Sequence, residues 1–135
     1  MNDYNRQIIE EFRANEGKVG GPLEGVPLLL LITTGAKSGE QRINPLAYHS
    51  DGERLVVIAT KNGAPTNPDW YHNLVAHPDV SVEVGTESFE ARATLVEGAE
   101  RDELFAKRVA VMPSFAEFQA MTTRTFPVVV LTRKA

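Results

Sequence analysis

The chain has 135 residues, a length that fits one domain with a buried core. Hydrophobic residues make up 42% and charged residues 24%, which is typical of a globular domain and excludes a chain dominated by disorder, collagen repeats or coiled coil. The sequence contains no cysteine, which excludes a disulfide framework, a thiolate nucleophile and a metal site with cysteine ligands. The net charge of −4 argues against nucleic acid as a partner, because proteins that bind nucleic acids usually carry basic surfaces.

Residues 1–25 are predicted to form an N-terminal helix and a flexible connector. Four apolar or aromatic side chains line one face of a helix over residues 3–15, namely Tyr4, Ile8, Ile9 and Phe12. Asn2 or Asp3 is expected to cap this helix. Its apolar face either packs on the rest of the protein or lies on lipid, and its modest charge favours packing.

Neither a secretion signal nor a membrane span is expected. The first six residues lack the apolar core of a signal peptide. The longest apolar run, over residues 26–32, is much shorter than the roughly 20 residues needed to cross a bilayer. We therefore expect a cytoplasmic protein, with peripheral association at the inner face of the cell membrane as the alternative.

Six strands are predicted from apolar runs and from alternation of apolar and polar residues. They lie at residues 27–34, 41–50, 54–60, 80–84, 89–95 and 127–132. The first is a continuous apolar run, which indicates burial on both faces. Glycine-containing turns separate several consecutive strands, as expected for hairpins.

Further helices are predicted over residues 68–76, over residues 99–111 and in a short segment that begins at Pro113. Asn67 is a candidate N-cap of the first, with Pro68 at its first helical position. In the second, Leu104 and Val109 should face inward, whereas four neighbouring residues should be solvated: Glu100, Arg101, Asp102 and Glu103. Hairpins without a βαβ repeat indicate an α+β fold, a mostly antiparallel sheet curled into a small barrel with helices packed outside.

The charge is distributed unevenly along the chain. Residues 36–62 carry four Lys or Arg and three Asp or Glu, whereas residues 79–104 carry two basic and eight acidic residues. An acidic protein therefore has a mildly cationic segment. Either this segment forms a cationic groove or its charges are scattered over solvated faces.

The segment 33–42 offers a tight turn with cations on either side. Gly35 and Gly39 allow a close approach to the backbone N–H groups, and Lys37 and Arg42 add charge-assisted hydrogen bonds for an anion. The order of residues differs from that of a phosphate-binding P-loop, in which the loop also opens a helix. An ordinary glycine hairpin with solvated basic residues is the alternative.

The segment 59–74 joins a strand end to a polar loop and a helix N-terminus. Helix N-termini attract anions, and Lys61 adds a positive charge to this loop. Trp70, the only tryptophan, is an apolar plane that can stack on a flat ring. Alternatively, Trp70 packs the helix onto the barrel.

No metal site is expected, because no carboxylates accompany the three histidines at ligand spacing: His49, His72 and His77.

Residues 30–46 and 61–74 resemble the deazaflavin-dependent nitroreductase family, whose actinobacterial members use coenzyme F420. The similarity extends over about residues 25–133. The resemblance implies a single split β-barrel domain, the fold of flavin-binding pyridoxamine-oxidase-like proteins, and a homodimer. It also implies a small-molecule acceptor as the partner.

The resemblance assigns a set of positions to the cofactor. Lys37, Arg42 and Lys61 match basic residues that hold its phosphate and oligoglutamate tail, a role that suits the cationic segment. Other positions line the deazaflavin or lie next to these, and the complete set is Lys37, Ser38, Arg42, Asn44, Pro45, Thr60, Lys61, Asn62, Gly63, Ala64, Pro68, Asp69, Trp70 and Asn73.

The implied reaction is hydride transfer from C5 of the reduced deazaflavin to a flat apolar acceptor such as a quinone, an enone or a nitroaromatic compound. Candidates for protonating the product are Tyr48, Tyr71 and Thr60. Ala47, Phe115 and Phe118 stand where nitroreductase-like members place tyrosines over the acceptor, which argues against efficient reduction of bicyclic nitroimidazoles. An FMN-dependent oxidoreductase of the same fold and a non-catalytic carrier of deazaflavin or lipid are the alternatives.

Overall fold

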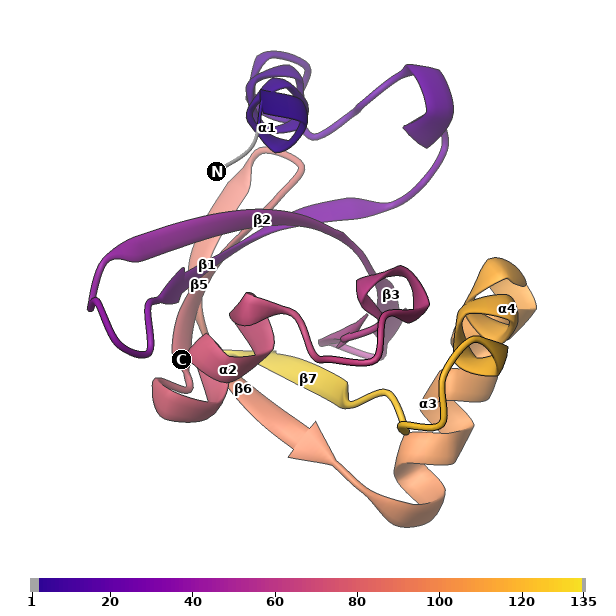
Figure 1. Ribbon diagram of the computed structural model, residues 1–135. Helices are drawn as coiled ribbons and strands as arrows, with labels where there is room; N and C mark the ends of the chain where they lie inside the picture. The colour runs from indigo at the N-terminus through magenta and orange to yellow at the C-terminus, as the bar shows by residue number, and fades with distance from the viewer. Residues whose placement is uncertain (1–2, 135) are drawn as a thin grey trace.

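The computed structural model describes residues 3–134, which form a seven-stranded sheet with four α-helices (Figure 1). The helices are α1 (Asp3–Ala14), α2 (Asp69–Ala76), α3 (Gly98–Val111) and α4 (Ser114–Ala120), with short 3₁₀ turns η1 (Gly21–Leu23) and η2 (Lys61–Gly63). The strands are β1 (Leu28–Thr34), β2 (Gln41–Ala47), β3 (His49–Asp51), β4 (Arg54–Ile58), β5 (Asp79–Val84), β6 (Glu87–Val96) and β7 (Val128–Arg133).

The sheet curls into a split barrel. Its strand order is β2-β1-β5-β6-β7-β4-β3, and every neighbouring pair is antiparallel. The strands at the two ends of this order, β2 and β3, are separated in sequence by Tyr48 alone. The two ends of the sheet must therefore lie side by side, which a flat sheet cannot achieve. The predicted α+β fold with a curled antiparallel sheet is confirmed.

The predicted single strand over residues 41–50 is wrong, because the chain changes partners at Tyr48. Ala47 of β2 is paired with Leu28 of β1, whereas His49 of β3 is paired with Val56 of β4. The Tyr48 backbone N–H donates to the Pro27 carbonyl at 3.1 Å, between the two ladders. Both halves keep strand-like alternation, so a sequence pattern alone cannot reveal the change of partner.

Strand β1 has an almost wholly apolar sequence because both of its faces are buried. Leu29 and Leu31 face a cluster that includes Trp70 and Leu74 of α2, whereas Leu28 and Leu30 face α1. The residues of α1 that are buried against them are Ile8, Ile9 and Phe12. The prediction that this helix packs on the protein is confirmed, and Figure 1 shows α1 lying across the outside of the sheet. Within residues 3–134, no helix has both the length and the apolar character needed to span a membrane.

Helices α3 and α4 cover the other side of the barrel, over β4 and β7. Leu104 is buried there as predicted, but the expectation that Arg101 is solvated is wrong. Its side chain is only 14% exposed and donates two hydrogen bonds to the Phe126 carbonyl. Arg101 and Arg108 lie three residues before and four residues after Leu104, so all three share the inward stripe of the helix.

The N-cap predicted for α2 is also wrong. Pro68 occupies the cap position with φ −70°, and no side chain caps the helix. The Asn67 side chain is used elsewhere, since its Oδ1 accepts a hydrogen bond from Arg124 at 2.7 Å. Of the two candidate caps of α1, Asn2 lies outside the described residues.

Candidate functional site

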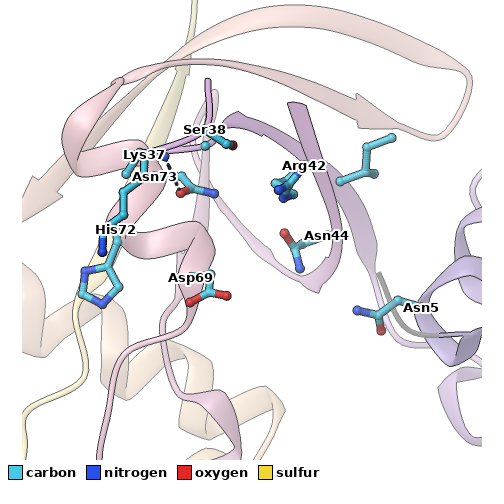
Figure 2. A pocket seen from close by; sticks show the side chains of 11 residues that line it. Asn5, Lys37, Ser38, Arg42, Asn44, Asp69, His72 and Asn73 are labelled. Carbon is cyan, nitrogen blue, oxygen red and sulfur yellow. Dashed lines mark hydrogen bonds between the residues drawn. The ribbon is translucent and has the colours of Figure 1, made fainter. Parts of the chain in front are cut away.

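A cavity of about 800 Å³ opens where the β1–β2 turn meets α2 (Figure 2). Lys37 comes from the turn, and Asp69 and His72 come from α2, whereas Arg42 and Asn44 project from β2 (Figure 2). The complete lining consists of Asn5, Gly35, Ala36, Lys37, Ser38, Arg42, Ile43, Asn44, Asp69, His72 and Asn73. The two segments that the sequence singled out therefore meet at one cavity.

The turn over residues 35–40 is held by its own backbone and leaves two donors free. The Gly35 N–H donates to the Glu40 carbonyl at 2.7 Å, and the Glu40 N–H donates to the Ser38 hydroxyl at 3.1 Å. A Cβ at Gly35 would clash with this hydroxyl, so a larger residue there would force the Ser38 side chain to move. Among the described residues, no acceptor faces the N–H groups of Lys37 and Ser38. Two consecutive free N–H groups in a turn are suited to an anion.

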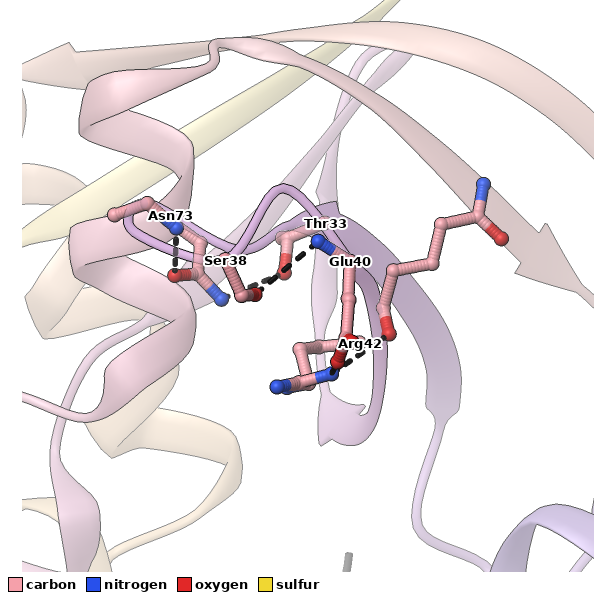
Figure 3. A network of polar contacts seen from close by, with 7 residues as sticks. Thr33, Ser38, Glu40, Arg42 and Asn73 are labelled. Carbon is pink, nitrogen blue, oxygen red and sulfur yellow. Dashed lines mark hydrogen bonds and ion pairs between the residues drawn. The ribbon is translucent and has the colours of Figure 1, made fainter.

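Asn73 of α2 fixes this turn against the helix (Figure 3). Its Oδ1 accepts the Ala36 N–H at 3.0 Å, and its Nδ2 donates to the Thr33 hydroxyl at 3.1 Å. Both side chains are almost inaccessible, with Asn73 7% and Thr33 1% exposed. The amide of Asn73 is therefore committed to protein atoms, and it sets the position of the turn relative to α2.

Two cations and one carboxylate line the cavity. Arg42 forms an ion pair with Glu40 at 3.0 Å on the exposed surface, which leaves other guanidinium donors available. Lys37 has no carboxylate partner among residues 3–134. Asp69 opposes these charges at the first turn of α2. Once Glu40 is counted, the two positive and two negative charges around the cavity cancel, so donors rather than net charge would attract an anion. These donors are the Lys37 ammonium, the free backbone N–H groups and the amides and hydroxyl of the lining.

The cationic segment of the sequence is not one continuous surface. Arg54 pairs with Asp51 and Glu100 beside α3, where Lys107 joins the same carboxylate of Asp51. The Lys61 ammonium donates to the Thr66 hydroxyl at 3.3 Å and does not line the cavity. Among residues 3–134, the Lys and Arg side chains that line the cavity are therefore those of Lys37 and Arg42.

The structure divides the predicted cofactor-binding residues into two groups. Those that line the cavity are Lys37, Ser38, Arg42, Asn44, Asp69 and Asn73. Those that lie outside its lining are Pro45, Thr60, Lys61, Asn62, Gly63, Ala64, Pro68 and Trp70. Most of the second group belongs to the loop between β4 and α2, which leads into the cavity through Asp69.

Trp70 is a core residue in this structure. It is 5% exposed and packs with Leu29, Leu31 and Leu74 in the cluster inside the barrel. Asp69 lines the cavity and Trp70 does not, because neighbouring residues of a helix point about 100° apart. Trp70 therefore packs α2 onto the barrel, which is the alternative to stacking on a flat ring.

The three candidate proton donors lie outside the lining of this cavity. Tyr48 borders a separate cavity of about 440 Å³. Tyr71 borders another of about 280 Å³, and its ring also meets His72 edge-on with the centroids 5.4 Å apart. Thr60 is 8% exposed, and its carbonyl accepts a hydrogen bond from Arg124.

The three predicted acceptor-pocket residues fall into two places, because Ala47 lies in a different cluster from Phe115 and Phe118. Phe115 and Phe118 pack on each other, with ring centroids 5.8 Å apart, in the cluster beneath α3 and α4. Ala47 packs instead against the cluster beneath α1. Strand β2 turns its odd-numbered residues toward that helix, and this orientation depends on the pairing of the strand.

Several lining residues were missed by sequence reasoning. His72 was not assigned to the site, although Asp69, His72 and Asn73 share one helix face by their spacing, which is a usable signal. Asn5 and Ile43 carry no such signal. They reach the cavity only because α1 packs beside β2, a tertiary contact between distant segments.

Comparison with known proteins identifies the family of the chain. Residues 4–133 match the model of the family described as F420H(2)-dependent quinone reductase. The chain is 38% identical over 129 residues to an F420H(2)-dependent quinone reductase of Mycobacterium tuberculosis, an alignment that covers 91% of this chain and 85% of the relative.

Solved structures give the same result. The structure of an F420-H2 dependent reductase (FDR-A) matches with 38% identity and a TM-score of 0.72, over 78% of this chain and 93% of that one. A domain-swapped dimer matches with 34% identity and a TM-score of 0.75, over 96% and 97% of the two chains. The resemblance to F420-using reductases drawn from the sequence is confirmed, and the chain belongs to the F420H(2)-dependent quinone reductase family.

Proposed function

We propose that this protein is a reductase that uses reduced coenzyme F420 to transfer a hydride to a quinone. The observation that carries the proposal is the cavity between the β1–β2 turn and α2, where free backbone N–H groups and two cations converge. Membership of the family supports the same cofactor and acceptor class.

The residues at the cavity fit this cofactor. Coenzyme F420 carries a phosphodiester and several carboxylates, and the N–H groups of Lys37 and Ser38 with the Lys37 ammonium and the Arg42 guanidinium are donors for such anions. A volume of about 800 Å³ lies within the range of cofactor sites. Lys37, Ser38, Arg42 and Asn44 would hold the anionic part.

When bound, reduced F420 supplies the hydride, so the protein has to bind, orient and shield the reactants. Asn73 keeps the turn at a fixed place on α2, which orients the free N–H donors before binding. We propose Tyr71 as the group that protonates the product, because of the three candidates it is the one seen to pack on the cavity residue His72. Tyr71→Phe should then lower kcat and leave F420 affinity unchanged.

Turnover with purified protein tests the proposal. Reduced F420 is mixed with menadione under anaerobic conditions, and the return of oxidised F420 absorbance is followed with and without protein. We expect oxidation faster than in the buffer control and dependent on protein concentration. Absence of both F420 binding and turnover would refute the proposal, and co-purification of FMN would favour the flavin alternative.

We further propose that the protein is a homodimer. A similar chain of known structure is described as a domain-swapped dimer, and it covers nearly the whole of this one. Light scattering coupled to size exclusion should give twice the 14.9 kDa mass of one chain. A mass of one chain at micromolar concentration would contradict the proposal.

A further inference from the structure

The loop over residues 59–67, between β4 and α2, has an unfavourable backbone. Lys61, Asn62 and Gly63 all have positive φ, at 47°, 54° and 84°. Left-handed conformations are disfavoured for residues with a Cβ. Gly63 has no alternative, because a Cβ there would lie 2.9 Å from the Phe118 carbonyl oxygen. Such a conformation persists only where surrounding contacts hold it.

Arg124 supplies those contacts at both ends of the loop. Its Nη1 and Nη2 donate to the carbonyls of Ala59 and Thr60 at 3.1 and 2.8 Å, where the loop begins. Its Nε donates to the Ala64 carbonyl at 2.8 Å, and Nη1 also donates to Asn67 Oδ1 at 2.7 Å, where the loop ends. One planar guanidinium therefore joins the two ends of the loop.

Arg124 is itself fixed in place. Its carbonyl accepts a hydrogen bond from Gln119 of α4 at 2.7 Å, and its guanidinium lies over the buried ring of Phe126 with 4.7 Å to the centroid. An ammonium group cannot replace this arrangement, because lysine lacks the flat fork that reaches several carbonyls at once and stacks on a ring.

We propose that Arg124 is a positioning residue for the reductase, an inference that rests on the function proposed above. It does not line the cavity, so it acts through the loop. Asn67 lies two residues before Asp69, so the bond from Arg124 fixes where α2 starts and hence where Asp69 and His72 stand in the cavity. The same loop carries Thr60 and Lys61, which the family resemblance assigns to the cofactor.

Two variants and one matched control test the inference. Arg124→Met removes the guanidinium at similar length, and Arg124→Lys keeps the charge and serves if the methionine variant fails to fold. Arg133→Met is the control, because Arg133 also donates a side-chain hydrogen bond, to Glu87 at 3.0 Å, and stacks on a ring, that of Phe89, without touching the loop or Phe126.

The first measurement is amide hydrogen exchange of the cofactor-free protein, read on peptides that cover residues 59–67. We expect exchange in this segment to rise about tenfold in both Arg124 variants, the change that corresponds to the loss of one to two hydrogen bonds. The Arg133 control should leave the segment at the wild-type rate. Unchanged exchange in the Arg124 variants would overturn the inference.

The second measurement is the Kd for F420, obtained by titration at equilibrium. We expect the Arg124 variants to bind about tenfold more weakly and the Arg133 control to bind like the wild type. Faster exchange with unchanged Kd and kcat would overturn the positioning role and leave the proposed function intact. A wild-type protein that does not bind F420 would overturn the proposed function, and the positioning role with it.

Discussion

Replacing Asn73 with alanine should destabilise the protein and loosen the turn at the cavity. The substitution removes the hydrogen bond to the Ala36 N–H at 3.0 Å and the bond to the Thr33 hydroxyl at 3.1 Å. A typical internal hydrogen bond contributes about 1 kcal/mol, and a buried group left without a partner costs about 1–3 kcal/mol. Thr33 is 1% exposed and cannot regain water, whereas Ala36 is exposed and can. The expected loss is therefore about 2–3 kcal/mol.

A double-mutant cycle isolates the Asn73–Thr33 contribution. Thr33→Val keeps the shape of the side chain and removes the hydroxyl, and it should cost about 1–2 kcal/mol because the Asn73 amide loses an acceptor. The double variant should cost less than the sum of the single variants, with a coupling of about 1 kcal/mol.

Equilibrium unfolding in urea measures all three variants. The fluorescence of Trp70 is a suitable probe, because this single tryptophan packs in the cluster beside Asn73 in α2. Urea slopes that stay equal to that of the wild type would show that only stability changed. Costs that add within about 0.5 kcal/mol, or a cost of Asn73→Ala below that value, would refute the reasoning.

Three further predictions concern the cavity, the core and a half-buried histidine. Lys37→Ala should weaken F420 binding, most strongly at low salt, whereas alanine at the exposed Lys18 should not; equal salt dependence of binding in the two variants would contradict the role of Lys37. Trp70→Ala should cost about 3–5 kcal/mol by urea unfolding, since it empties a core position, and a cost below about 1 kcal/mol would show that the ring is not a core residue. Burial, together with the charge of Arg108, lowers the pKa of His49 from 6.5 to about 4. Between pH 4 and pH 6.5 the unfolded chain therefore binds a proton at this histidine, whereas the folded protein does not. The contribution of His49 to the free energy of unfolding should therefore be complete above pH 6.5 and be lost toward pH 4, by about 1–2 kcal/mol after allowance for partial exposure. If His49→Gln shows the same pH profile of unfolding as the wild type, His49 is not the source of the pH dependence.

The sequence predicted most of the elements, because hydrophobic periodicity is a local property. The alternation in β5 and β6, the apolar run of β1 and the amphipathic face of α1 all lie where the pattern placed them. The break at Tyr48 was missed, since it marks a change of hydrogen-bond partner between two distant strands. Arg101, Arg108 and Arg124 were not recognised as buried or bonded, because a charged side chain gives no sequence signal of the carbonyls that it meets.

The sequence by itself determined the two segments that form the site, the turn with Lys37 and the N-terminal turn of α2. Each is short and contiguous, so its hydrogen-bond donors and charges can be read from neighbouring residues. Only the tertiary structure decided which side chains share the cavity. Curling of the sheet brings β2 and α2 to one cavity, turns Trp70 into the core and places Tyr48 and Tyr71 at the borders of two different cavities. These outcomes depend on strand pairing and helix orientation, which are set by contacts between residues far apart in the chain. The mildly cationic segment of an acidic protein thus resolves into two charges, Lys37 and Arg42, at one cavity.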